Sequence, residues 1–230
     1  MNRSVAIGSV VLVAAALAPI HVAGRAGEKD DKLSAKEMTA ILEKARAKYD
    51  VPGMAAGIVR LGEKPLTAVA GVRKRGLAAK VTIDDAWHLG SNTKPMTALL
   101  TTVLIDQGLL DWETPLEQIF PEYAGKWKED LKKITPAHLV THTSGLPDRG
   151  PVRQFMAAQS VKTPQQDRAK IVKDLAEVEL SAKPGEKYEY SNLGYVLLGA
   201  IIDKRGKAPW EEQFKKRICQ PLGTVGVFSK

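Results

Sequence analysis

The sequence predicts a protein of the α/β (α+β) class, in which a helix and an antiparallel hairpin precede a mostly helical region. Residues 35–72 carry one helical apolar pattern and then two short strand-like runs, and from about Thr93 apolar residues recur at helical spacing. The chain of 230 residues is long enough to bury a core, and its 44% hydrophobic and 26% charged residues are typical of a globular protein.

The first helix is expected over residues 35–49. Ser34 and Glu37 form a capping box in front of it, with serine at the N-cap and glutamate three residues on. Two strands are expected at residues 54–60 and 66–72, joined by a turn. An isolated hairpin is only marginally stable in water, so this pair needs a larger sheet, for which the rest of the sequence offers few strands.

The region from residue 91 onward is expected to be mostly helical. An apolar helical pattern begins near Met96 and ends at Gly108. Further helices are expected to begin at Thr135–Pro136, to run from Thr163–Pro164 to about Val178, from Leu193 to Lys204 with a stop at Gly206, and from Pro209 to Cys219. The sequence thus divides into an N-terminal helix and hairpin, residues 27–90, and a mostly helical part, residues 91–230.

The first 26 residues have the layout of a secretory signal peptide. Arg3 supplies a positive charge, residues 5–20 are apolar or small, and small residues follow at positions 23, 24 and 26. This pattern predicts export to the periplasm or the extracellular space, with residues 27–230 as the domain. The alternative is an uncleaved membrane anchor, although a membrane span needs roughly 17–25 apolar residues.

Charge and cysteine content bear on partners and on redox chemistry. The formal net charge is +8, but basic residues such as Lys126 and Lys132 are scattered, and no aromatic and basic platform for nucleic acid is visible. We therefore expect no nucleic-acid partner. Cys219 is the only cysteine, so no internal disulfide is expected. We expect Cys219 to be a core residue near a helix end, because a thiol nucleophile would need a nearby partner.

Ser91 and Lys94 form the first candidate for chemistry. A serine hydroxyl is a poor nucleophile until a base takes its proton, and a lysine whose pKa is lowered by burial can serve as that base. The two residues are three apart at the predicted start of a helix, so they share one face, and the free N–H groups there favour negative charge. The alternative is a serine N-cap followed by a surface lysine.

Tyr190 and Asn192 form the second candidate. They follow a Pro184-Gly185 turn and precede an apolar helix. A tyrosine at such a junction can reach a neighbouring cleft and exchange a proton with a serine, and an asparagine can contact both a lysine and a substrate amide. The alternative is a loop tyrosine with an asparagine at a helix N-cap.

His138 and His142 are four residues apart, which raises the question of a metal pair. No glutamate follows His138 as in the metalloprotease arrangement, and no further ligands cluster nearby. We therefore expect structural hydrogen bonds from both histidines, at a helix end that turns near Gly145. Neither a metal nor another cofactor is expected.

Four segments stand in the order and spacing of a known family. They are Trp87-His-Leu-Gly-Ser-Asn-Thr-Lys94, His138-Leu-Val-Thr-His-Thr-Ser-Gly-Leu146, Pro184-Gly-Glu-Lys-Tyr-Glu-Tyr-Ser-Asn-Leu-Gly-Tyr195 and Gln220-Pro-Leu-Gly223. Together they resemble the beta-lactamase-related serine hydrolases, a group similar to class C β-lactamases, penicillin-binding D-alanyl-D-alanine carboxypeptidases and related esterases. The resemblance covers essentially everything after the signal segment.

The resemblance implies a beta-lactamase/transpeptidase-like fold, with helices on an antiparallel sheet and an inserted helical domain. It implies an acyl-enzyme mechanism on a β-lactam, a D-alanyl peptide of peptidoglycan or an ester. Ser91 would be the nucleophile, with its own backbone N–H in the oxyanion hole. Lys94 would be its base or proton relay and Tyr190 the second acid/base, and Asn192 would contact substrate and lysine.

One family motif has no counterpart here. The family carries Lys-Thr-Gly, His-x-Gly or a similar motif on a later strand, and nothing after Tyr190 matches it. On this resemblance the C-terminal strands and helix would be missing, together with the second oxyanion donor, whose loss typically costs about 10²–10³ in rate. The alternative function is therefore a catalytically silent homologue, or one half of a split protein that needs a complementing C-terminal fragment.

Overall fold

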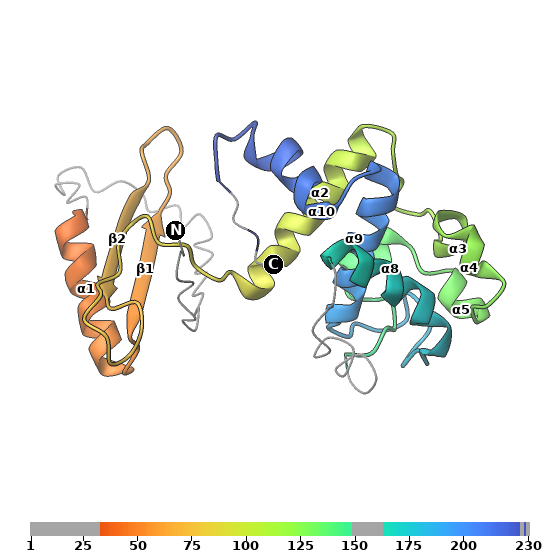
Figure 1. Ribbon diagram of the computed structural model, residues 1–230, viewed down its shortest axis with the longest axis horizontal. Helices are drawn as coiled ribbons and strands as arrows, with labels where there is room; N and C mark the ends of the chain where they lie inside the picture. Colours follow the sequence, from red (N-terminus) through yellow and green to blue (C-terminus); the bar gives the residue numbers. More distant parts are fainter. Residues whose placement is uncertain (1–32, 149–162, 226–227, 229–230) are drawn as a thin grey trace, which may run out of the picture. The chain divides into compact units, whose positions relative to one another are not determined.

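The computed structural model describes residues 33–148, 163–225 and 228, so the predicted signal segment lies outside its scope (Figure 1). The chain divides after Gly90 into two compact units, and each is described by itself. Among the residues described, no helix is both long and apolar enough to cross a membrane.

The first unit is a helix on a hairpin (Figure 1). Helix α1 (Ala35–Lys48) begins with the predicted capping box: the Ser34 hydroxyl accepts the Glu37 N–H (3.2 Å), and the Glu37 carboxylate accepts the Ser34 N–H (2.8 Å). Strands β1 (Gly53–Ile58) and β2 (Leu66–Gly71) pair antiparallel, with Gly53 opposite Gly71. The predicted helix and hairpin are both confirmed.

The core of this unit is small. Met38 and Leu42 of α1 pack on Ala68 and Ala70 of β2, which lie two residues apart and so face the same side of the sheet. Ile41, an apolar residue of the same helix, is exposed. In the described part of the chain the sheet has two strands, and Trp87 forms an isolated β-bridge outside them.

The second unit is built around helix α9 (Asn192–Gly206). Leu197, Leu198, Ile201 and Ile202 of α9 are all fully buried, and residues 197–203 are buried without a break, so this stretch of the helix lies inside the unit. It packs against α2 (Thr93–Asp106), α6 (Pro136–Val140), α8 (Pro164–Asp174) and α10 (Trp210–Phe214). The remaining short elements are α3 (Leu116–Ile119), α4 (Pro121–Ala124), α5 (Glu129–Lys132), the 3₁₀ turns Gly90–Asn92 and Leu175–Glu177, and the π-helical turn Lys215–Cys219.

The predicted helices of this unit are confirmed, with three corrections, the first being that α8 ends at Asp174 and a 3₁₀ turn follows in place of its last predicted turn. Thr135 and Thr163 cap α6 and α8 through their side chains, as their Thr-Pro sequences indicated. The N-cap of α9, however, is Ser191 and not Asn192, and its hydroxyl accepts the Gly194 N–H (3.1 Å). The last predicted helix becomes π-helical after Phe214. Cys219 is buried, in agreement with its expected place in the core.

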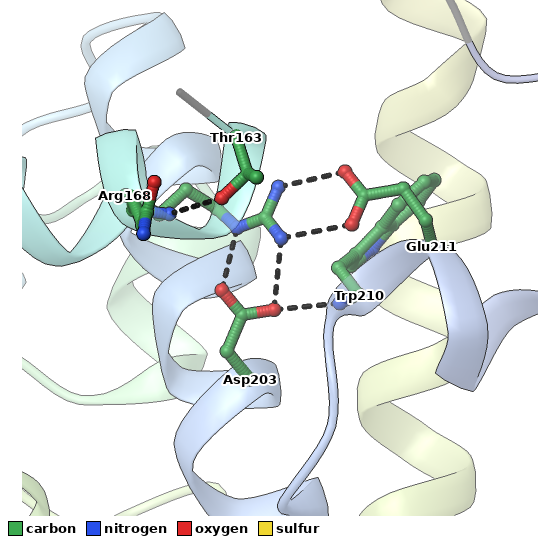
Figure 2. Close-up of polar contacts among 6 residues, drawn as sticks. Thr163, Arg168, Asp203, Trp210 and Glu211 are labelled. Atoms are coloured by element: carbon green, nitrogen blue, oxygen red, sulfur yellow. Dashed lines mark hydrogen bonds and ion pairs between the residues drawn. The ribbon is translucent and has the colours of Figure 1, made fainter. Parts of the chain in front are cut away.

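A buried ion cluster joins α8, α9 and α10 (Figure 2). The Arg168 guanidinium donates to both carboxylate oxygens of Asp203 (2.7 and 2.9 Å) and to both of Glu211 (3.0 Å each). Asp203 also accepts the Trp210 N–H (2.6 Å). A Cβ on Gly199 would lie 2.9 Å from the Arg168 Cδ, so glycine there leaves room for the arginine stem.

Burial and charge pairing compete in this cluster. Burial raises the pKa of Asp203 despite its hydrogen bonds with Arg168. Burial also acts to raise the pKa of Glu211, but hydrogen bonding to Arg168 outweighs it, and the pKa lies below its usual value. Each carboxylate therefore depends on Arg168 to remain charged inside the protein.

We predict that Arg168→Ala destabilises the second unit by about 3–5 kcal/mol, because it leaves the buried Asp203 and the partly buried Glu211 without their cationic partner. Urea unfolding of the whole chain measures the change. Lys170→Ala on the same helix is the matched control, because it removes an exposed lysine that pairs with Asp174, and its expected cost is below about 1 kcal/mol. Equal small losses from both variants would contradict a stabilising role for the cluster.

Candidate active site

The four side chains singled out in the sequence meet in the second unit. The Ser91 hydroxyl lies 2.8 Å from the Tyr190 hydroxyl. The Lys94 ammonium donates to Ser91 Oγ (3.3 Å) and to Asn192 Oδ1 (2.7 Å). Ser91 and Lys94 thus form one hydrogen-bonded group with Tyr190 and Asn192, which lie about a hundred positions later in the sequence.

Ser91 is held in a 3₁₀ turn, Gly90–Asn92, directly before α2. The serine thus lies at the start of the helix, as expected, but in a 3₁₀ turn before the first α-helical residue, Thr93. Gly90 has a φ of +53°, a left-handed conformation that glycine adopts without strain. The three-residue separation still brings Lys94 onto the same side as Ser91.

Tyr190 is positioned by two loops that run side by side. The backbone N–H groups of Ser181, Gly185 and Glu189 donate to the carbonyls of Gly145 (2.9 Å), Thr143 (2.8 Å) and His142 (2.8 Å), respectively. Gly145 has a φ of +73°, and a Cβ there would lie 2.1 Å from the Ala182 carbonyl oxygen. Only glycine therefore allows the loops to approach this closely.

His142 supports Tyr190 directly. Its ring stacks on the Tyr190 ring, with centroids 4.5 Å apart, and its Nδ1 accepts the Ser191 N–H (3.1 Å). An accepting Nδ1 belongs to the neutral ring with its proton on Nε2. Burial first, and then the charge of Lys94, lower the pKa of His142 and favour this neutral form.

His138 makes the structural contacts that were predicted for it. Its Nδ1 accepts the Thr135 N–H (3.2 Å) and completes the cap of α6. Within residues 33–148, 163–225 and 228, no group of three or more His, Cys, Asp or Glu side chains is arranged to hold a metal ion.

The pKa values of the two tyrosines beside Lys94 are shifted in opposite directions. Partial burial acts to raise the pKa of Tyr190, but hydrogen bonding to Lys94 and Ser91 and the lysine charge outweigh it, so the pKa is lowered. Burial raises the pKa of Tyr195, whose hydroxyl donates to the Val140 carbonyl (3.0 Å). Tyr190 is therefore the better placed of the two to exchange a proton with Ser91.

Two residues of this group were missed in the sequence. Asp148 accepts the backbone N–H of Asn192 (2.8 Å) and its side-chain Nδ2 (3.1 Å). The Tyr195 ring centroid lies 5.5 Å from the Lys94 ammonium. The Tyr190 ring centroid lies 4.8 Å from the same ammonium. Neither has a local signal, because each contact joins segments far apart in the chain.

The arrangement provides a hydroxyl with two proton-exchanging neighbours. A nucleophile and its base typically lie within about 2.6–3.2 Å, or somewhat further when no substrate is bound. The contacts from Ser91 to Tyr190 and to Lys94 fall at these separations. Lys94 is held by the side-chain oxygen of Asn192 and by the faces of the Tyr190 and Tyr195 rings.

The mixed helices, the small antiparallel sheet and the serine, lysine and tyrosine group define a protein of the beta-lactamase/transpeptidase-like fold. Residues 38–227 match the Beta-lactamase family, and the chain belongs to that family of serine hydrolases. The predicted resemblance and fold class are both confirmed.

Relatives and solved structures agree with this assignment. The chain is 29% identical over 180 residues to "Penicillin-binding protein 4" of Amycolatopsis lactamdurans, covering 77% of this chain and 45% of that protein. It is 30% identical to the octameric penicillin-binding protein homologue from Pyrococcus abyssi (TM-score 0.66; 83% of this chain, 43% of that one). It is 25% identical to the D-amino acid amidase from Ochrobactrum anthropi SV3 complexed with L-phenylalanine amide (TM-score 0.66; 84% and 54%).

The chain spans less than half the length of the curated relatives it matches. "Protein flp" of Staphylococcus aureus (strain COL), 26% identical over 189 residues, is covered over 37% of its length, against 82% of this chain. The family assignment therefore applies to the matched residues, 38–227.

We predict that His142 makes stability fall with decreasing pH. The pKa of His142 is lowered in the folded state, so the unfolded chain binds the proton more readily. The stability that neutral His142 contributes is therefore present above the ordinary histidine pKa of about 6.5. It is lost as the pH falls through the lower pKa of His142 in the folded state. His142→Asn keeps an acceptor and tolerates the left-handed backbone (φ +58°) but does not titrate.

Urea unfolding of both proteins at about pH 8 and about pH 5 tests this, because histidine titrates between these values. The stability advantage of the wild type over the variant should shrink at the lower pH. A difference that stays constant across the range would show that His142 protonation does not affect the fold.

Proposed function

We propose that the chain is a serine hydrolase that works through an acyl-enzyme, with Ser91 as the nucleophile. One observation carries the proposal: the Ser91 hydroxyl lies between the Tyr190 hydroxyl (2.8 Å) and the Lys94 ammonium (3.3 Å). Such a hydroxyl needs a proton acceptor to attack a carbonyl. The membership of the Beta-lactamase family supports the same chemistry.

In the proposed first step Ser91 Oγ attacks the substrate carbonyl carbon as its proton moves to Tyr190. The lowered pKa of Tyr190 makes its phenolate accessible, and the Lys94 charge stabilises that phenolate. Collapse of the tetrahedral intermediate breaks the bond to the leaving group, which takes the proton back from Tyr190. Lys94 acts as the proton relay between the two hydroxyls, and water later hydrolyses the ester on Ser91.

Substrate contacts would come from Asn192 and from the backbone N–H of Ser91, which is proposed as one oxyanion donor. The substrate class is an acyl donor such as a β-lactam, a D-alanyl peptide or an ester. Similarity to a penicillin-binding protein and to a D-amino acid amidase supports a small amide or a peptidoglycan peptide. The proposal also includes export, because residues 1–26 have a signal-peptide pattern.

We predict that the purified chain gains one acyl adduct at Ser91. Intact mass spectrometry after incubation with a penicillin, or with a fluorophosphonate, measures the adduct. Ser91→Ala should gain none. Lys94→Ala and Tyr190→Phe should label roughly 10²–10⁴-fold more slowly, since each removes a proton-transfer partner. Cys219→Ser should label as the wild type does, because this thiol is buried in the core.

Other outcomes assign different functions. Full labelling of Ser91→Ala would place the nucleophile elsewhere. A folded wild-type chain that gains no adduct from either probe would favour the alternative, a catalytically silent family member or one half of a split protein.

A further inference from the structure

Asp148 makes a contact that bears on Lys94 without touching it. Its Oδ1 accepts the Asn192 backbone N–H (2.8 Å) and its Oδ2 accepts the Asn192 side-chain Nδ2 (3.1 Å). On the opposite side of the same amide, Asn192 Oδ1 accepts from the Lys94 ammonium (2.7 Å). One side chain thus has its donor end and its acceptor end occupied by partners of opposite charge.

An asparagine amide has two orientations related by a half-turn, and its partners decide which one is stable. A carboxylate only accepts hydrogen bonds, and an ammonium only donates them. With Asp148 on one side and Lys94 on the other, the observed orientation satisfies both contacts. The reversed orientation would set the amide oxygen against a carboxylate and its NH₂ against an ammonium.

We propose that Asp148 is a positioning residue that fixes the Asn192 amide so that its oxygen holds Lys94 beside Ser91. Asp148 also accepts a backbone N–H at the start of α9, so a competing explanation is that it only caps this helix. The inference about catalysis rests on the proposed function, but the orientation of the amide is a property that can be measured by itself.

The first test compares Asp148→Asn with Ser191→Ala. Asp148→Asn replaces one acceptor with an NH₂ group, so one Asn192 contact is lost and the amide is free to turn. Labelling of Ser91 by a fluorophosphonate should slow roughly tenfold to a hundredfold, the scale of a small displacement of a reacting group. Ser191→Ala removes the N-cap hydroxyl of the same helix and should lower only the melting temperature. Equal labelling rates in the two variants, each corrected for the fraction of folded protein, would show that Asp148 acts only as a helix cap.

A second test exchanges the two side chains. In Asp148→Asn combined with Asn192→Asp, the new amide at position 148 offers its oxygen to the backbone N–H of residue 192 and its NH₂ to the new carboxylate. That carboxylate still accepts from Lys94, so all three hydrogen bonds return with the net charge unchanged. The exchanged pair should label Ser91 faster than either single variant, as coupled residues do in a double-mutant cycle. Rate losses that multiply would overturn the proposal.

A measurement independent of chemistry separates this proposal from the proposed function. In ¹H–¹⁵N spectra the side-chain NH₂ of Asn192 should exchange slowly with water in the wild type and in Ser191→Ala, and rapidly in Asp148→Asn. A wild type that shows this exchange pattern but gains no fluorophosphonate adduct would overturn the proposed hydrolase function and leave the positioning contact supported. Exchange unaffected by Asp148→Asn would remove the positioning role, whatever the labelling shows.

Discussion

The N-terminus of α9 is the constraint on which both the core and the candidate site depend. Leu197 and Ile201 are buried completely, so packing fixes the rotation of this helix and its position along its axis. Ser191 caps it, and the residues on either side of the cap are Tyr190 and Asn192. Because the cap is one point in a rigid helix, the phenol and the amide are placed by the same packing that stabilises the unit. A loop without such a helix behind it would leave both side chains free to move.

The charge of Lys94 then organises the protonation states around it. A nearby cation lowers the pKa of any titratable group, but with opposite consequences for a base and for an acid. For His142 the lower pKa, to which burial contributes most, favours the neutral ring. The neutral ring has the free Nδ1 that accepts the Ser191 N–H. For Tyr190 it favours the phenolate, against the effect of burial. Burial and the ammonium therefore both favour the uncharged supporting ring, and hydrogen bonding together with the ammonium charge prepares the neighbouring phenol to accept a proton.

The sequence predicted the parts of this arrangement that have a local signal. Apolar periodicity and Thr-Pro starts located most helices, and the three-residue spacing of Ser91 and Lys94 put them on one side of the chain. The 3₁₀ turn at Ser91 was not predicted, because it differs from an α-helical turn only in where one hydrogen bond closes. Asp148 had no signal either, since its role comes from a contact with Asn192, 44 positions away. Long-range pairing of loops is set by packing and leaves no period in the sequence.

The candidate site draws all its side chains from the unit that begins at Ser91. These side chains are those of Ser91, Lys94, Tyr190, Asn192, His142 and Asp148. The helix and hairpin of the first unit contribute none of them. Acylation and turnover make different demands on these residues. Acylation needs a hydroxyl with a proton acceptor, which the contact between Ser91 and Tyr190 provides in geometric terms. Both steps need a stabilised oxyanion, and turnover also needs a positioned water, so formation of the acyl adduct is the step that these side chains bear on most directly.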